Sequence, residues 1–196
     1  MRVSKEKAAE NRIALLRAAS QLFRQRGIDG VGVAEVAKAA GLTHGALYAH
    51  FPSKEALVAE AFAFGFDSNM VGVREWAEAS HRSFDEYLDV LLSTEARDNL
   101  ETGCPMTASA SEIARQGDDV STRFVNAFEE LVSTLEATLM EIKPRAKRRR
   151  LAVAAVTAEI GAIAVSRAVA KANPTLAEEV LESTRKTVAK SRAALP

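Results

Sequence analysis

The sequence predicts an all-α fold. Apolar residues recur every three to four positions along most of the chain, the spacing of helices with one buried face, and alternating β-branched runs are scarce. Hydrophobic residues make up 47% of the 196 residues and charged residues 27%, an ordinary balance for a soluble globular chain. The length suits one large domain or two smaller ones that share an interface.

A first helix is expected before residue 27. Ile13, Leu16, Ala19 and Phe23 share one predicted face, and arginines flank it. Gly27 is placed to end this helix, because glycine adopts the backbone conformation that follows a helix C-terminus without strain.

Two short helices are expected next, over residues 33–39 and 44–50, with Val36 and Ala37 facing inward. Gly41 can take a positive φ and turn the chain in few residues. Thr43 is placed to cap the second helix, because a hydroxyl can accept from the free backbone N–H groups of a first turn. Two short helices joined by a tight turn predict a helix-turn-helix, whose second helix fits the DNA major groove.

Longer helices are expected to make up the rest of the chain. Ser53 can cap a helix that begins at Lys54 and runs into the seventies. Gly and Pro breaks separate further helices, expected over 84–96, 106–115, 124–142, 147–171 and 176–193. We expect residues 1–54 to form one domain and 55–196 a second, antiparallel helical domain, with the helix from Lys54 shared between them.

The charge is unevenly distributed. Residues 1–54 carry nine lysines and arginines and four acidic residues, a net charge of +5, which leaves −5 on the remainder of a neutral chain. A basic end on an acidic body favours a polyanionic partner at that end, although a solvated basic helix without a partner has the same charge.

Cysteine content and hydropathy favour the cytoplasm. Cys104 is the one cysteine, so an intramolecular disulfide is impossible. The first residues lack the apolar segment of a secretory signal. The most apolar stretch, 151–172, contains Glu159 and Arg167 and is rich in alanine. We therefore interpret it as a buried or interface helix and expect no membrane partner.

Enzyme signatures are missing from the sequence. It contains no glycine-rich phosphate loop, no HExxH motif, no clustered Cys/His spacing and no Ser/His/Asp context. We expect no catalytic residue, no metal and no cofactor. A small helical enzyme stays open as an alternative that turnover on a substrate would reveal.

The segment around the short helices closely resembles the tetracycline-repressor (TetR/AcrR) family of transcriptional regulators. The matching residues are spaced through 10–60: Leu22-Phe23, Gly27, Val33, Val36-Ala37, Ala40-Gly41-Leu42-Thr43, Gly45, Leu47-Tyr48, His50-Phe51, Lys54 and Leu57. The resemblance implies a three-helix DNA-binding head and a helical effector-binding and dimerisation domain. It also implies a homodimer on a palindromic double-stranded DNA operator, with a small-molecule effector that releases it. A helical ligand-binding or interaction module that has lost DNA binding is the alternative.

The resemblance assigns DNA-contact roles residue by residue. It implies phosphate contacts for Thr43, Tyr48, His50 and Lys54, and positions facing base edges for His44, Gly45 and Ala46, with Lys38 as a further contact. One position departs from the family pattern, because Gly32 stands where a capping Thr or Ser is usual. Glycine still caps tolerably, so we expect weaker anchoring rather than loss of binding.

Aromatic, methionine and cysteine side chains in the middle of the chain are candidates for the effector pocket. A pocket lined this way would suit an apolar or aromatic effector, and plain core packing is the alternative for each residue. The candidates are Phe62, Phe66, Met70, Trp76, Phe84, Tyr87, Cys104, Met106, Phe124 and Phe128.

Three features of the second half stay open at this stage. Cys104 is either a thiol sensor or a small buried hydrophobic residue. Glu159 either pairs with an arginine across a dimer interface of small residues or faces the pocket. The basic run 147–150 is interpreted as a solvated helix start, with a nucleic-acid patch as the weaker alternative.

Overall fold

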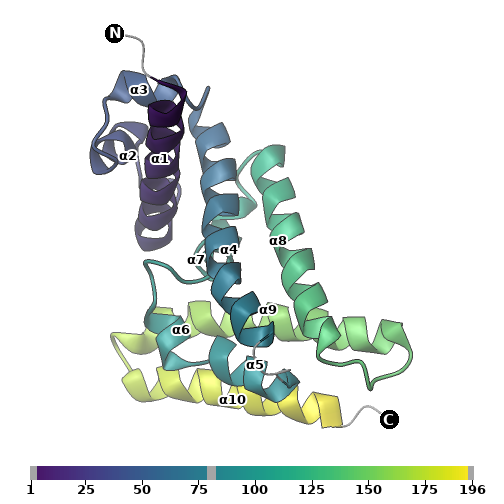
Figure 1. Ribbon diagram of the computed structural model, residues 1–196. Coiled ribbons are helices and arrows are strands. Elements are labelled where there is room, and N and C mark those ends of the chain that lie inside the picture. The colour runs from purple at the N-terminus through teal and green to yellow at the C-terminus, as the bar shows by residue number, and fades with distance from the viewer. Residues whose placement is uncertain (1–3, 79–82, 194–196) are drawn as a thin grey trace. The chain divides into compact units, whose positions relative to one another are not determined.

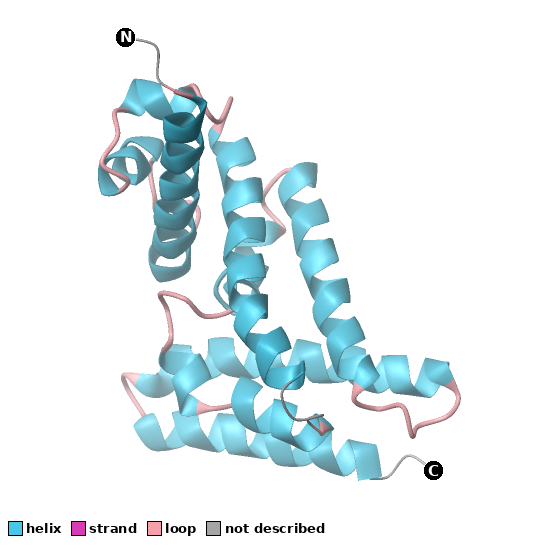
Figure 2. Cartoon of the chain, in the orientation of Figure 1, coloured by secondary structure: helices cyan, strands magenta, loops and turns pink. Residues whose placement is uncertain are grey.

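The computed structural model describes residues 4–78 and 83–193, and of these the side chains at 76–78 and 193 are not described. Within these ranges every regular element is a helix (Figure 2), which confirms the predicted all-α class. The helices in chain order are α1 (Lys5–Arg26), α2 (Val33–Ala39), α3 (His44–Tyr48), α4 (Lys54–Glu78), α5 (Phe84–Leu91), α6 (Thr94–Asp98), α7 (Pro105–Ile113), α8 (Asp118–Ala137), α9 (Arg145–Ala170) and α10 (Pro174–Ala193).

The chain forms two compact units. The first contains Met1–Met70 and Leu100–Val125, and the second contains Val71–Asn99 and Asn126–Pro196. Helices α4 and α8 each contribute to both units. The functional division at Lys54 stays a prediction, and the first compact unit extends past it.

Helix α1 supplies the central face of the first unit. Leu15, Leu16, Ala19 and Phe23 are buried, and the N–H of Gly27, at φ 80°, bonds the Phe23 carbonyl to close the helix. The prediction for Ile13 was wrong, because its side chain is 47% exposed. At about 100° per residue, Ile13 lies roughly a quarter turn from the centre of the buried face.

Helices α2 and α3 form the predicted helix-turn-helix, seen beside α1 in Figure 1. Val36 and Leu47 are fully buried, and Gly41 turns the chain at φ 70°. Helix α3 ends at Tyr48, two residues earlier than expected. Phe51 precedes a proline, which disfavours helical backbone at this point, and its side chain is fully buried.

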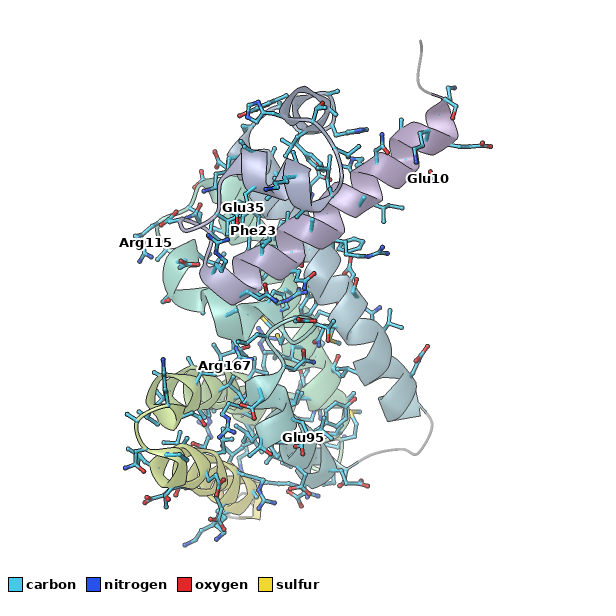
Figure 3. The ribbon with its side chains drawn as sticks, turned by 90° about the vertical axis from the view of Figure 1, so that its left-hand side faces the viewer. Glu10, Phe23, Glu35, Glu95, Arg115 and Arg167 are labelled. Carbon is cyan, nitrogen blue, oxygen red and sulfur yellow. The ribbon has the colours of Figure 1, made fainter. Side chains whose placement is uncertain are left out.

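The second unit is built on α9 and α10, which lie side by side (Figure 1). The Ser166 hydroxyl donates to the Ala177 carbonyl at 2.8 Å and joins the two helices. Arg167, labelled in Figure 3, donates from α9 to the carbonyls of Ala96 at 3.1 Å and Arg97 at 2.6 Å. These bonds satisfy carbonyls at the end of α6 that lack partners within a helix.

Other predicted helix boundaries were wrong, and the helix expected from residue 124 begins at Asp118. The helix expected over 84–96 is broken at Ser93, whose hydroxyl accepts from the Ala96 N–H and starts α6. The helix expected over 124–142 ends at Ala137, after which Leu139 and Ile142 stay buried in a turn of i to i−3 bonds. At Ser93 a side-chain hydrogen bond, and after Ala137 a series of i to i−3 backbone bonds, takes the place of the i to i−4 bonds that would continue the helix.

Two helical segments, 54–75 and 145–170, are long and apolar enough to cross a membrane by length and composition. The core helices of soluble proteins meet the same criterion. Leu57, Val58 and Phe66 of α4 are buried, and α9 packs on α10, so these apolar residues have a role inside the units.

Candidate nucleic-acid interface

Helix α3 is fixed by its cap and by one apolar residue. The Thr43 hydroxyl accepts from the Ala46 N–H at 3.2 Å, as expected for an N-cap. Leu47 is fully buried. A helix of little more than one turn with its Leu47 side pointing inward presents its other side chains to solvent.

His44 and Tyr48 lie on that exposed face, one helical turn apart. Their ring centroids are 5.1 Å apart in an edge-to-face arrangement, and Tyr48 is 46% exposed. An edge-to-face pair is a favourable aromatic geometry, so each ring restricts the orientation of the other. Neither residue belongs to the core, which leaves both able to meet a duplex.

Small side chains make up the remainder of the face. Gly45 is exposed and Ala46 is half-buried. A Cβ placed on Gly45 would meet no atom within 4 Å. The packing of this unit therefore does not require glycine at position 45, and the position is suited to the close approach of an external backbone.

The predicted cationic contacts lie at neighbouring helix ends. Lys38 is exposed at the end of α2, and Lys54 is half-buried at the start of α4. Neither ammonium makes a hydrogen bond or ion pair with another described residue. His50 is half-buried, with its ring 6.5 Å from that of Phe51. The lysine charges are thus available to phosphate groups.

A further basic residue, Arg12, was not predicted as part of this region. Its guanidinium lies 5.0 Å from the Phe51 ring centroid and forms an ion pair with Glu60. The ion pair between Arg12 and Glu60 therefore connects α1 to α4 beside Phe51. Nothing in the α1 sequence distinguishes it from the arginines that are exposed.

Gly32 has the backbone of a helix N-cap without its hydroxyl. Its φ and ψ are −89° and 150°, and no side-chain bond caps α2. A Cβ at this position would meet no atom within 4 Å. A serine would fit here, so the departure from the family pattern has no steric cause in the described residues.

The candidate pocket residues divide between the two units. Phe62, Phe66, Met70 and Met106 are buried in the first unit, and Phe84 and Tyr87 in the second. Burial raises the pKa of the Tyr87 hydroxyl. Phe124, Phe128 and Cys104 are half-buried, and the Trp76 side chain lies outside the described residues.

Phe62 packs on Phe124 with 5.8 Å between ring centroids and also lines a cavity of about 20 Å³, the room of one water molecule. The effector pocket therefore stays a prediction.

A larger cavity in the first unit has a polar lining that the sequence analysis missed. Its volume is about 310 Å³, and its walls come from α1, α4 and the loop before α7. Arg24 spans one side, donating to the Ser20 hydroxyl at 2.7 Å and to the Glu101 carbonyl at 3.0 Å. Burial lowers the pKa of Arg24. The arginines of α1 resemble a solvated face in sequence, so no pattern indicates this cavity.

The basic run 147–150 lies in the first turns of α9, and its interpretation as a solvated helix start is wrong for Arg148, which is buried, whereas Arg150 is exposed. Arg148 is 7% exposed and donates to the Ile142 carbonyl at 3.2 Å. Arg145 and Arg149 pair with Glu136 at 2.8 Å and Glu129 at 2.7 Å. The Arg145 hydrogen bond, with further help from nearby arginine charges, lowers the pKa of Glu136. The acidic partners come from the preceding helix, so the run alone does not reveal them.

Sequence models of two known groups match the chain. The model of the bacterial regulatory proteins of the tetR family matches residues 15–61. The model of the C-terminal domain of LmrA/YxaF-like transcriptional regulators matches residues 80–178, about half of the chain.

Curated relatives are similar over part of the chain. The transcriptional repressor KstR2 of Rhodococcus jostii is 33% identical over 131 residues, covering 67% of this chain and 60% of that protein. The regulator AcrR of Shigella flexneri is 44% identical over 59 residues, covering 30% of this chain and 27% of its own length. The chain thus matches less than two thirds of each relative's length.

Solved structures share the fold at low sequence identity. A TetR regulator from Chloroflexus aurantiacus superposes with a TM-score of 0.76 at 24% identity, covering 97% of this chain and 98% of that one. The reduced form of Escherichia coli NemR gives a TM-score of 0.75 at 20% identity, covering 92% and 95%. These likenesses support the helical arrangement alone.

Proposed function

This chain belongs to the tetR family of bacterial regulatory proteins, and we propose that it is a sequence-specific DNA-binding repressor, released from its operator by a small-molecule effector. The observation that carries this proposal is the exposed face of α3. His44 and Tyr48 point away from the core on a helix fixed by Leu47 and Thr43. In this role the protein carries out no catalytic step and works in the cytoplasm.

We assign the side chains of α3 to two kinds of DNA contact. His44 is the one polar side chain at the start of the helix that can read a base edge, and Gly45 and Ala46 allow close approach. Tyr48, His50, Thr43, Lys38 and Lys54 are assigned to phosphates, which fix the orientation of the helix without reading sequence.

The proposed functional form is a homodimer formed through α9 and α10. Between residues 151 and 170 the exposed face of α9 carries only small or apolar side chains and one threonine: Ala154, Thr157, Gly161, Ala164, Val165 and Ala168. Leu176 of α10 adds an apolar side chain that is 39% exposed. Small uncharged residues favour close helix packing between subunits. Such a dimer would present two recognition helices about 34 Å apart, the spacing of successive major grooves.

We propose that effector binding lowers operator affinity through the helix that begins at Lys54. Because coupling between two binding sites is reciprocal, operator DNA should weaken effector binding by the same factor. An apolar or aromatic effector suits the side chains available in the middle of the chain.

The direct test is fluorescence anisotropy with DNA from the intergenic region upstream of the gene, across a range of salt concentrations. We expect binding that prefers one palindromic site over a scrambled duplex at physiological salt. Binding without preference, or dimerisation without DNA binding, would refute the repressor assignment. The second result would instead favour a helical module that no longer binds DNA.

Substitutions separate the two kinds of contact. Lys54→Ala should weaken binding to all sequences and reduce the salt slope by about one. The matched control is Lys143→Ala, which removes an exposed lysine from the loop between α8 and α9. His44→Ala should change base preference. Unchanged affinity and salt slope for Lys54→Ala would exclude that phosphate contact.

Gly45 tests close approach independently of charge. Alanine meets no atom within 4 Å at this position and favours helix by about 0.5–1 kcal/mol, so the variant should be at least as stable as the parent. If α3 enters the groove, the added methyl should weaken operator binding. Full affinity in a stable Gly45→Ala variant would place the duplex away from this face.

A further inference from the structure

One carboxyl in the second unit has no explanation in the packing. Glu159 lies on the buried face of α9 and is only 3% exposed. Its Oε2 atom is enclosed and has no hydrogen-bond partner among the described residues. Buried polar groups nearly always have partners, so an orphaned one calls for a ligand, an ion or a water.

The neighbours of Glu159 on its own helix supply no donor. Ala155, Val156, Ala162 and Ile163 surround it at helical spacing and are buried aliphatic residues. The next polar side chain on this face, Ser166, already donates to the Ala177 carbonyl. Two of the four neighbours are alanines, the smallest side chains that still form helix well.

The nearby cation is committed elsewhere. Arg167 lies eight residues along α9, a rise of about 12 Å, and donates to the carbonyls of Ala96 and Arg97. Its charge lowers the pKa of Glu159 only as a secondary effect. The ion-paired groups on α6 and α10 are Arg97 with Asp98, Arg185 with Asp89, Lys186 with Glu182, and Arg192 with Asp85 and Glu141. Glu95, Glu178 and Glu179 are acidic, and Lys190 is an exposed lysine in the last turn of α10.

Burial dominates the ionisation of this carboxyl. Loss of solvation raises the pKa of Glu159 to about 8, only partly offset by Arg167. The carboxyl is therefore mostly protonated at pH 7, as an acid in an apolar surrounding. A perturbed, unpartnered acid inside a unit is a functional-site candidate with a stated physical cause.

We propose that the Glu159 carboxyl is the recognition point for a small organic cation, a protonated amine or amidinium on an apolar or aromatic frame. The positively charged N–H groups of such a ligand supply the donors that Oε2 lacks. Calling this ligand the effector rests on the proposed repressor function, whereas its binding does not.

Binding would include a proton transfer. The cation favours the ionised carboxylate, so the carboxylic acid O–H bond breaks and its proton passes to buffer while N–H to oxygen hydrogen bonds form. From the pKa of about 8, roughly nine tenths of a proton should leave per bound cation at pH 7. Affinity should rise about tenfold between pH 7 and pH 9, because the ionised fraction rises by that factor.

The test uses the full chain with benzamidine and hexylamine as probes, and benzamide as the uncharged isostere of benzamidine. Isothermal titration in two buffers of different ionisation enthalpy measures affinity and proton release together. We expect at least one cation to bind at least tenfold more tightly than benzamide and to release its proton. Glu159→Gln should lose both properties, since it keeps the acceptor and the volume but cannot ionise.

Equal binding of both cations to the parent and to Glu159→Gln, or binding of neither, would overturn the proposal. Thermal unfolding checks that the Gln variant is folded. Operator binding measured on the same preparations separates the two claims. Cation binding without operator recognition defeats only the repressor function, and operator recognition without cation binding defeats only the role of Glu159.

Discussion

Glu159 should make the stability of this protein fall as the pH rises, and Glu159→Gln should remove that dependence. The ordinary pKa of the carboxyl is 4.5, and burial raises the pKa of Glu159 to about 8. Between these values the native state holds the proton more tightly than the unfolded state. Each pH unit in that window therefore lowers the free energy of unfolding by about 1.4 kcal/mol. The contribution is fully present below pH 4.5 and is lost as the pH rises through 8.

Over the whole window the loss amounts to roughly 5 kcal/mol, a large part of the 5–15 kcal/mol typical of a folded protein. Guanidinium unfolding at several pH values from 5 to 9 measures it. The difference between parent and Glu159→Gln isolates this residue, because every other group titrates in both proteins. Glu179→Gln, which changes the same charge at an exposed position on α10, is the matched control. Parallel profiles for the parent and Glu159→Gln would refute the reasoning.

Three further substitutions test the packing of the first unit by chemical denaturation. Thr43→Ala removes the cap of α3 and should cost about 1 kcal/mol, which Thr43→Ser should largely restore. Gly65→Ala places a Cβ 2.1 Å from the Ser20 hydroxyl oxygen and should cost about 1–3 kcal/mol. By contrast Gly72→Ala, on the same helix with nothing within 4 Å, should be neutral or stabilising. Arg24→Met loses its bonds to Ser20 and to the loop before α7 and should cost about 2 kcal/mol. Equal effects at the two glycines, a neutral Thr43→Ala or a neutral Arg24→Met would contradict the corresponding contact.

The helix-turn-helix could be predicted from sequence because its determinants are local. Gly27, Gly41 and Thr43 each act through their own backbone or their nearest turn, and all three behave as the sequence indicates. The break at Ser93 also had a local signal, a serine able to cap the turn that follows. It was outweighed by apolar spacing that continues on both sides of it. Ile13 was misplaced for a different reason, since the packing of neighbouring helices decides which of several apolar residues on α1 is buried.

The exposed face of α3 was predictable for the same local reason, because Leu47 fixes which side turns inward. The sequence could not separate pocket residues from core residues, because aromatic side chains serve core packing and ligand binding equally well. Phe62 illustrates this, being packed on Phe124. The partners of Arg24 and Arg148 were also beyond reach, because each arginine contacts residues that the sequence does not place beside it. Arginines that cannot be distinguished in the sequence can be exposed, ion-paired or buried in the folded protein.

The domain boundary predicted at Lys54 does not coincide with a boundary between compact units. The Ile28 N–H donates to the Glu112 carboxylate at 2.9 Å, and the Gln116 amide lies 3.4 Å from the Asp29 carboxylate. Arg24 holds the Glu101 carbonyl in the same way. These bonds tie the end of α1 and the loop that follows it to α7 and its flanking loops within one compact unit. Leaving a buried donor unpaired costs about 1–3 kcal/mol, so the helix-turn-helix depends on residues about 80 positions away for its own stability.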